Sequence, residues 1–181
     1  MKTAIFFIAI LPNREICSEI KTFKEYTLAH FDSGHALRSP AHITLEPPFK
    51  WDMDQLSMLE SALKSFAEKA SPFTIELNDF DVFSPKVVFV KVLKNKALWD
   101  FQYELTSFLR SDLNLLSDRP DRPFHPHMTI AFKDLRKEMF LKARDHFSKI
   151  TYQRNIKADQ ICLLQHNGKV WKEKAFFKMN E

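Results

Sequence analysis

One short phrase of this 181-residue chain occurs twice. "AHITLEPPF" starts at Ala41 and "PHMTIAF" starts at Pro126, which places His42 and His127 85 positions apart. Alternate side chains of an extended strand share a face, so each copy points a histidine and a threonine one way and its apolar residues the other way. Each copy therefore predicts a strand that is anchored by apolar side chains and displays an imidazole beside a hydroxyl.

The predicted secondary structure repeats around the two phrases. Hydrophobic periodicity in the first half predicts the strands 4–10, 41–45 and 73–77 and the helices 15–30 and 54–70. In the second half it predicts the strands 87–93, 127–132 and 160–165 and the helices 96–113 and 135–148. A last strand, 170–178, follows the turn residues Asn167 and Gly168.

The two halves share a β-α-β-α-β order, and their first strands begin 83 positions apart, at Ala4 and Val87. We therefore predict an internal duplication within one domain, 1–181, with lobes of about 1–80 and 81–181 and a terminal strand able to cross between them. Identity between the halves is thin, so a chance likeness of two α/β halves is the alternative. A duplicated fold would bring the two phrases together across a pseudo-twofold axis.

Composition predicts a folded protein of a reducing compartment. Hydrophobic residues make up 45% of the chain, which is enough to form a core. Cys17 and Cys162 lie far apart and in no metal-binding spacing, so we expect no disulfide framework and a cytoplasmic location. The opening run "MKTAIFFIAI" is too short to span a bilayer and lacks a small-x-small cleavage site, which favours a buried strand over a secretory signal. We expect a monomer without a membrane partner.

The paired histidines suit acid–base chemistry on a phosphodiester. One imidazole can take a proton from the attacking oxygen while the other protonates the leaving oxygen, and an unperturbed pKa of about 6.5 makes both forms available. The hydroxyls of Thr44 and Thr129 can donate to the non-bridging phosphate oxygens, so no metal or other cofactor is required.

An isolated His-x-Thr is more often a strand histidine that is hydrogen-bonded to a nearby carbonyl. Random placement of the 7 His and 8 Thr would give roughly 0.3 such pairs in this chain. Two copies at equivalent points of a repeat therefore favour a functional role over a structural one.

The segments "PAHITLEPPF", "FHPHMTIAF" and "HNGKVW" resemble the 2H phosphoesterase superfamily, and in particular its bacterial 2′-5′ RNA ligase-like branch. The resemblance spans nearly the whole chain and implies an α+β fold of two lobes, with antiparallel sheets around a central cleft. It also implies an enzyme that opens or forms 2′-linked phosphodiesters, commonly hydrolysing a 2′,3′-cyclic phosphate of RNA or of a nucleotide to a 2′-phosphate without metal or ATP. Carried onto this sequence, it makes His42 and His127 the catalytic acid and base, in an order that the motif does not fix, and Thr44 and Thr129 the phosphate-binding residues.

The sequence departs from this branch at one position. Many RNA ligase-like members carry an arginine directly after the threonine-apolar-alanine segment of the second motif. This chain has Phe132 at that position, followed by Lys133. Lys133 could supply the missing charge, although it would face the other side of a regular strand. The departure weakens the expectation of RNA end recognition and ligation more than that of phosphodiester chemistry.

Other residues near the phrases are candidates for substrate binding. Phe49 and Phe124 flank the two motifs and could stack on a base, although core packing is the more frequent role in a chain with 18 Phe. Loop cations near the motifs could contact a phosphate backbone, with solvated charge as the alternative, and these are Arg38, Lys50, Arg119, Arg122 and Lys133. Helical spacing predicts a core face made by Phe101, Tyr103, Leu105 and Phe108.

Two interpretations from other classes remain open. His125 and His127 could bind zinc in a metal-dependent hydrolase, but Pro126 lies between them and the sequence offers no obvious third ligand. A non-catalytic RNA-binding module would use the basic loops alone. The formal charge of +4 suits an anionic ligand such as phosphate or nucleic acid, and an ordinary basic surface explains it equally well.

Overall fold

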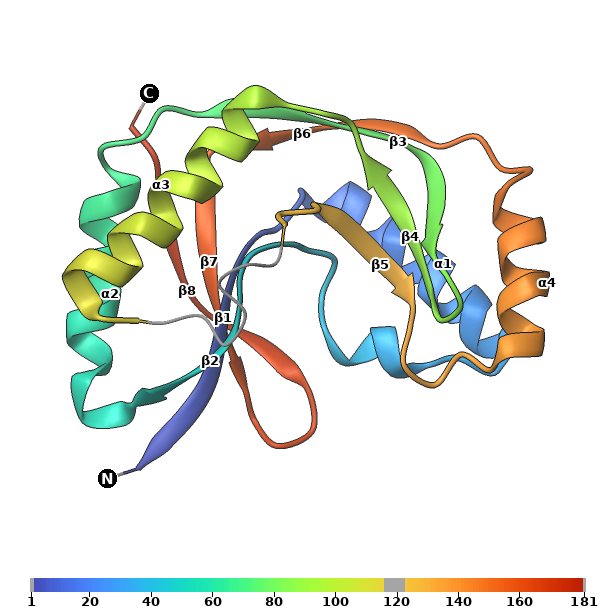
Figure 1. The fold of residues 1–181 in the computed structure, drawn as a ribbon, viewed down its shortest axis with the longest axis horizontal. Coiled ribbons are helices and arrows are strands. Elements are labelled where there is room, and N and C mark those ends of the chain that lie inside the picture. Colours follow the sequence, from blue (N-terminus) through green and yellow to red (C-terminus); the bar gives the residue numbers. More distant parts are fainter. Residues whose placement is uncertain (1, 116–122, 181) are drawn as a thin grey trace.

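The structure, a computed structural model, describes residues 2–115 and 123–180 and contains within them two four-stranded antiparallel sheets (Figure 1). The first sheet has the order β2-β1-β7-β8 and consists of β1 (Thr3–Ile10), β2 (Ile43–Asp52), β7 (Gln160–His166) and β8 (Trp171–Lys178). The second has the order β5-β4-β3-β6 and consists of β3 (Phe73–Phe83), β4 (Val87–Val92), β5 (His127–Ala131) and β6 (Gln153–Ala158). The predicted class, an α+β fold of two lobes with antiparallel sheets, is confirmed.

The two sheets combine strands that are far apart in the chain. β3 is longer than the predicted strand 73–77 and pairs with both β4 and β6, so it belongs to the second sheet. β7 runs antiparallel to β1, and β8 pairs with β7 as a hairpin. The last hairpin therefore returns to the first sheet, which combines β1 and β2 with β7 and β8.

The helices are exchanged between the sheets as well. α1 (Arg14–Phe31) packs against β5 of the second sheet and beside α4 (Lys137–Phe147). α3 (Lys96–Leu113) packs against β2, and α2 (Leu56–Ala67) packs against β8, both in the first sheet. Figure 1 shows α2 and α3 together on one side of the molecule and α1 and α4 together on the other. α1 thus packs on the sheet that does not contain β1 and β2, the strands on either side of it in the sequence.

α1 begins and ends where its sequence provides caps. The Asn13 side chain accepts a hydrogen bond from the Ile16 backbone N–H at 3.0 Å, and Asp32 ends the helix in the left-handed conformation. The buried stripe of this helix consists of Ile16, Ile20, Lys24, Thr27 and Phe31. Lys24 and Thr27 are polar residues at positions that an amphipathic helix normally gives to apolar ones.

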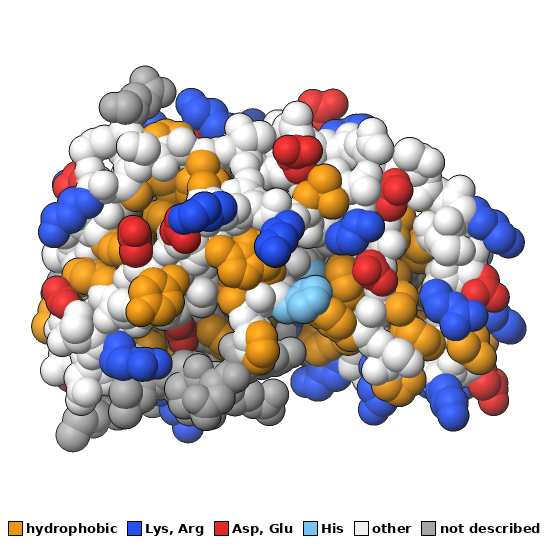
Figure 2. All heavy atoms as spheres, turned by 45° about the horizontal axis from the view of Figure 1, so that its top comes forward, with side chains coloured by type: hydrophobic (Ala, Val, Ile, Leu, Met, Phe, Trp, Pro, Cys, Tyr) orange, Lys and Arg blue, Asp and Glu red, His pale blue; other side chains and the backbone are white. Residues whose placement is uncertain are grey.

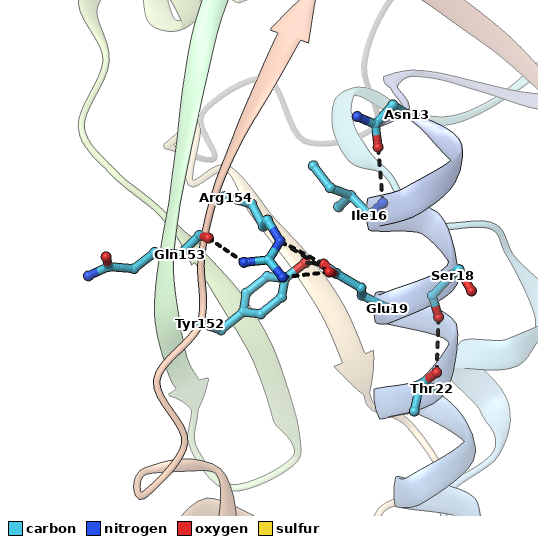
Figure 3. Close-up of polar contacts among 8 residues, drawn as sticks. All are labelled: Asn13, Ile16, Ser18, Glu19, Thr22, Tyr152, Gln153 and Arg154. Carbon is cyan, nitrogen blue, oxygen red and sulfur yellow. Dashed lines mark hydrogen bonds and ion pairs between the residues drawn. The ribbon is translucent and has the colours of Figure 1, made fainter.

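A polar cluster ties α1 to the second sheet (Figure 3). The carboxylate of Glu19 accepts hydrogen bonds from Arg154 Nε at 3.0 Å and from the Tyr152 hydroxyl at 2.6 Å. The hydrogen bond from Arg154 lowers the pKa of Glu19 and so favours its ionised form. Since Glu19 is 133 positions from Tyr152 in the sequence, this contact fixes α1 relative to a strand from the far end of the chain.

One large cluster of buried apolar residues runs through both lobes, from Phe6 and Ile8 of β1 to Met128 and Ile130 of β5. Among the described residues, no helix is both long and apolar enough to cross a bilayer. Figure 2 shows one face of the molecule, on which Lys and Arg side chains are interspersed with Asp and Glu side chains. On this face the positive charge is not gathered into a single patch.

Candidate active site

A cavity of about 820 Å³ brings the two His-x-Thr motifs together. His42, directly before β2, and Thr44 line one part of its wall, and His127 and Thr129 of β5 line another. β2 and β5 belong to different sheets but come within 8 Å of each other, measured between Cα atoms. Two segments that are remote in the sequence therefore face the same cavity.

The two imidazoles are held by the same hydrogen-bond pattern. His42 Nδ1 lies 2.8 Å from the Pro40 carbonyl oxygen, and His127 Nδ1 lies 2.7 Å from the His125 carbonyl oxygen. A carbonyl oxygen only accepts, so Nδ1 carries the proton in both rings. In the neutral ring Nε2 then carries the lone pair, which is the form that a general base needs.

His42 is half-buried, and its surroundings disfavour the protonated ring. Burial lowers its pKa to about 4, with smaller contributions in the same direction from the positive charge of Lys24 and from His127, while the Pro40 carbonyl opposes them. The ring of Phe7 lies 4.9 Å away between centroids and forms part of this apolar wall. His42 is therefore neutral at neutral pH.

His127 has aromatic neighbours of its own. The ring centroids of Phe83 and Phe89 lie 4.9 Å and 5.1 Å from that of His127, and the Phe83 ring is nearly perpendicular to the imidazole. These rings and the bond to the His125 carbonyl restrict the imidazole to one orientation. Both motif histidines are thus positioned by backbone and apolar contacts from their own lobe.

Lys24 is a buried cation whose charge acts on His42, and it was not among the predicted site residues. Its side chain is 3% exposed, and its ammonium group donates to the carbonyl oxygens of Ser39 at 2.9 Å and Pro40 at 3.2 Å. Burial lowers the pKa of Lys24 to about 8, so it remains largely charged at neutral pH. The Pro40 carbonyl consequently accepts from both Lys24 and His42. The sequence signal that could have revealed Lys24 is its position, because it falls where the helical periodicity of α1 calls for a buried apolar residue.

Replacing Lys24 by methionine is expected to raise the pKa of His42, because it removes a positive charge that disfavours the imidazolium. The titration of the His42 ring followed by NMR measures this directly. Lys21→Met is the matched control, because Lys21 is exposed on the same helix and pairs with Glu25. An unchanged titration of His42 in Lys24→Met would contradict the electrostatic role.

Asp134 links the two motif regions. Its carboxylate accepts from the Ser33 hydroxyl at 2.8 Å and from the backbone N–H groups of Gly34 at 3.0 Å and His35 at 2.8 Å. These bonds join the loop after β5 to the short 3-10 helix His35–Arg38, which leads into the first motif. Asp134 therefore helps to fix the separation of the two His-x-Thr segments.

Of the two phenylalanines that were predicted to stack on a base, only Phe124 lines the cavity. Phe124 lines the cavity and packs against Trp99, with ring centroids 5.3 Å apart. Phe49 is a core residue instead, 8% exposed and packed against Phe6 and Trp51, because β2 continues through both prolines and turns its side chain inward.

The loop cations Lys133 and Arg122 were also predicted to bind substrate. Lys133 does not line the cavity: β5 ends at Ala131, and Lys133 adopts a positive φ of 71° on the exposed loop that follows. Arg122, like Arg119, lies outside the described residues.

Two aromatic residues that were not among the predicted substrate-binding residues line the cavity. Tyr103 was predicted to be core but is 71% exposed, whereas Phe101 is 5% exposed. The reason is that residues two apart on a helix point in different directions. Phe132, which stands where the family often has arginine, is 38% exposed, lines the cavity and touches the His35 ring at 5.1 Å between centroids.

The residues described do not provide a metal-binding group of three or more His, Cys, Asp or Glu side chains. His125 is exposed and uses its carbonyl oxygen to hold His127. The zinc alternative, which needs a third ligand beside His125 and His127, therefore gains no support from these residues.

A second cavity, of about 610 Å³, adjoins the first. Ser39 and Trp171 line both cavities, so the two lie next to each other near the loop that precedes His42. Its charged wall residues are mostly cationic, with Glu173 as the acidic exception: Lys21, Lys24, Arg38 and Lys172.

Comparison with known proteins gives the family. The sequence profile of the 2′-5′ RNA ligase superfamily matches residues 12–170. The chain belongs to this superfamily. The predicted membership of the 2H phosphoesterases, in their 2′-5′ RNA ligase-like branch, is thereby confirmed, and it supports a phosphoesterase activity.

Relatives and solved structures agree with this superfamily. A Bacillus cytotoxicus protein named "Putative phosphoesterase" is 30% identical over 130 residues, which cover 70% of this chain and 68% of that protein. A Bacillus licheniformis protein with the same description is 25% identical over 128 residues, covering 70% and 69%.

The fold comparison extends over the whole chain. E. coli LigT complexed with 3′-AMP has a TM-score of 0.70 at 16% identity, covering 99% of this chain and 100% of that one. The protein TT0787 of Thermus thermophilus has a TM-score of 0.66 at 14% identity, covering 97% of each chain. At such identities the likeness shows a shared fold for this member of the 2′-5′ RNA ligase superfamily.

Proposed function

We propose that the chain is a metal-independent phosphoesterase that opens 2′,3′-cyclic phosphate ends or 2′-5′ linkages of RNA or nucleotides. The observation that carries the proposal is the meeting of both His-x-Thr motifs at one cavity. The complex of its structural neighbour LigT with 3′-AMP supports a nucleotide ligand. The two free thiols, Cys17 and Cys162, support action in the reducing cytoplasm, and we propose a monomer as the active unit.

His42 is the general base in this proposal, and His127 is the general acid. A neutral His42 can remove a proton from the attacking water through Nε2, because its pKa of about 4 keeps the ring unprotonated at neutral pH. As the new P–O bond forms, the bond from phosphorus to O3′ breaks, and protonated His127 supplies the proton that O3′ needs. The products are a 2′-phosphate and a 3′-hydroxyl, and solvent returns the two imidazoles to their starting states.

Thr44 and Thr129 stabilise charge in the transition state. Each threonine follows its histidine by two residues in the sequence and lines the same cavity. A hydroxyl that donates to a non-bridging oxygen stabilises the charge that builds up during in-line displacement. With proton transfer and charge stabilisation both assigned to side chains, the chemistry requires no metal.

Incubation with 2′,3′-cyclic nucleotides and cyclic-ended RNA, followed by phosphorus NMR, tests the proposed function. We expect a 2′-phosphate as product, with the same rate in the presence of EDTA. Abolition by EDTA would favour a metallohydrolase, and RNA binding without turnover of any substrate would favour a binding module.

The pH dependence of kcat/KM should reveal the low pKa of His42. The acidic limb reports the free enzyme, so we expect activity to fall only as the pH drops toward about 4, well below the ordinary imidazole value. Circular dichroism must accompany the assay. The pKa of His42 is lower in the folded protein than in the unfolded one. The contribution of His42 to the free energy of unfolding is therefore highest above about pH 6.5, and it decreases as the pH falls toward 4, because only the unfolded state gains the proton in that range. A limb near the ordinary value in folded enzyme would contradict the assignment of His42 as base.

The adjoining basic cavity favours RNA over a mononucleotide as the substrate. A cyclic-ended tetranucleotide could place its upstream phosphates near Arg38 and Lys172, so we expect its kcat/KM to exceed that of a cyclic mononucleotide by about tenfold at low salt. The excess should shrink in the double variant Arg38→Ala/Lys172→Ala. Lys142→Ala/Lys178→Ala, at exposed positions outside both cavities, is the control. Equal kcat/KM values for the two substrates would argue for a mononucleotide substrate.

A further inference from the structure

Glu46 places a buried carboxyl group in the wall of the candidate active site. It is 3% exposed, and it follows His42 and Thr44 at alternate positions. The pairing of β2 with β1 is irregular here, because Thr44 and Glu46 pair with the consecutive residues Ala9 and Ile8, so strict alternation of faces does not hold across Leu45. Glu46 nevertheless lines the same cavity as His42 and Thr44. It sits on the side of the cavity where α3 contributes Gln102 and Tyr103.

The carboxyl group has no hydrogen bond or ion pair to another group in residues 2–115 and 123–180. In the same part of the chain, no fully enclosed side-chain nitrogen or oxygen lacks a hydrogen-bond partner. The Glu46 oxygens are therefore not enclosed by protein and must open onto the cavity that this residue lines.

This position is unfavourable for a carboxylate. Burial raises the pKa of Glu46 to about 7, and the positive charge of Arg110 on α3 opposes the increase only in part. The residue opposite Glu46 on β1 is the apolar Ile8. A carboxyl group kept in such surroundings, within a cavity that has convergent polar groups, is typical of a group that meets a ligand.

We propose that Glu46 contacts the nucleobase of the substrate and selects guanine. This inference rests on the proposed function, since the phosphate bound between the histidines fixes where the base can lie. The Watson–Crick edge of guanine offers two adjacent donors, N1–H and the N2 amino group, which match the two oxygens of a carboxylate. Adenine, cytosine and uracil each offer one donor group on that edge.

The neighbouring side chains suit this assignment. The exposed ring of Tyr103 and the half-buried ring of Phe124 line the same cavity and provide faces on which a base can stack. The Gln102 side-chain amide donates to the Leu45 carbonyl oxygen at 3.2 Å, which fixes α3 against the strand that carries Glu46. Stacking would accept any base, so the carboxylate supplies the discrimination.

The test is a comparison of kcat/KM for the four nucleoside 2′,3′-cyclic phosphates with the wild type and with Glu46→Gln. We expect the wild type to prefer guanosine over adenosine by about tenfold, the scale of a bidentate contact to a base. In Glu46→Gln, which keeps the shape but presents only one oxygen, the ratio of guanosine to adenosine should fall toward one. Glu104→Gln, exposed on α3 and outside the cavity, should leave the ratio unchanged.

Equal values for guanosine and adenosine with the wild type, or an undiminished ratio in folded Glu46→Gln, would overturn the inference while leaving the proposed function intact. If the wild type opens none of the four substrates, the proposed function fails. Calorimetry then decides the Glu46 inference by itself: guanosine 3′-monophosphate should bind about tenfold more tightly than adenosine 3′-monophosphate, and equal affinities would contradict it.

Discussion

Replacement of His42 or His127 by alanine is expected to lower kcat for a 2′,3′-cyclic phosphate by a factor of about 10² to 10⁴, the usual range for a lost general acid or base. His42→Ala removes the group that takes the proton from water. His127→Ala leaves the departing O3′ without a proton donor. Both rings line the same cavity, so both losses should appear in kcat rather than mainly in KM.

The control for these variants is His30→Ala, which removes an exposed histidine in the last turn of α1, outside the cavity. Its kcat should equal that of the wild type. Thermal unfolding should show that both motif variants remain folded, because each imidazole is only half-buried. Turnover near the wild-type rate in either motif variant would remove that histidine from the mechanism.

Thr44→Val and Thr129→Val should each lower kcat by a factor of about 10² to 10³, the loss expected for one donor to a developing oxyanion. Valine keeps the β-branched shape that suits a strand, so β2 and β5 should retain their pairing. KM should change less than kcat, because the hydroxyl contributes most when charge accumulates on the phosphate.

Serine provides the matched comparison for the threonine variants. Thr44→Ser and Thr129→Ser keep the hydroxyl and lose only a methyl group, so they should recover most of the activity that valine loses. If serine and valine lower kcat equally, the threonines act through packing rather than through hydrogen bonding, and the assignment of phosphate binding fails.

The local structure was largely predictable from the sequence. The helix 96–113 was predicted with the bounds that α3 has, because Asn95 caps its first turn and Leu98, Leu105 and Leu109 mark one buried face. β6 was missed, since "QRNIKA" buries only Ile156 and Ala158 and gives a weak alternation. A strand with so few buried side chains is specified by its pairing with β3 more than by its own residues.

The assembly of the lobes was not predictable in the same way. The exchange of α1 and α3 between the sheets depends on contacts between residues about a hundred positions apart, such as those of Asp134 with Ser33 and Gly34. Periodicity shows that a helix has an apolar face but does not show which sheet it covers.

The candidate site was likewise predictable only in part. The His-x-Thr pairs were visible because their spacing is short and occurs twice. Lys24 and Glu46 were not, because each is a charged residue whose importance comes from burial, and a single lysine on a helix or glutamate on a strand is ordinarily exposed.

The central claim is that two imidazoles act on one phosphorus atom in one step. The measurement that tests it most directly is kcat of the double variant His42→Ala/His127→Ala, compared with the two single variants under identical conditions. Residues that act as a unit lose their effect together, so the double variant should be about as slow as the slower single variant. A rate lowered by the product of the two single effects would show that the histidines act independently, and would contradict the account.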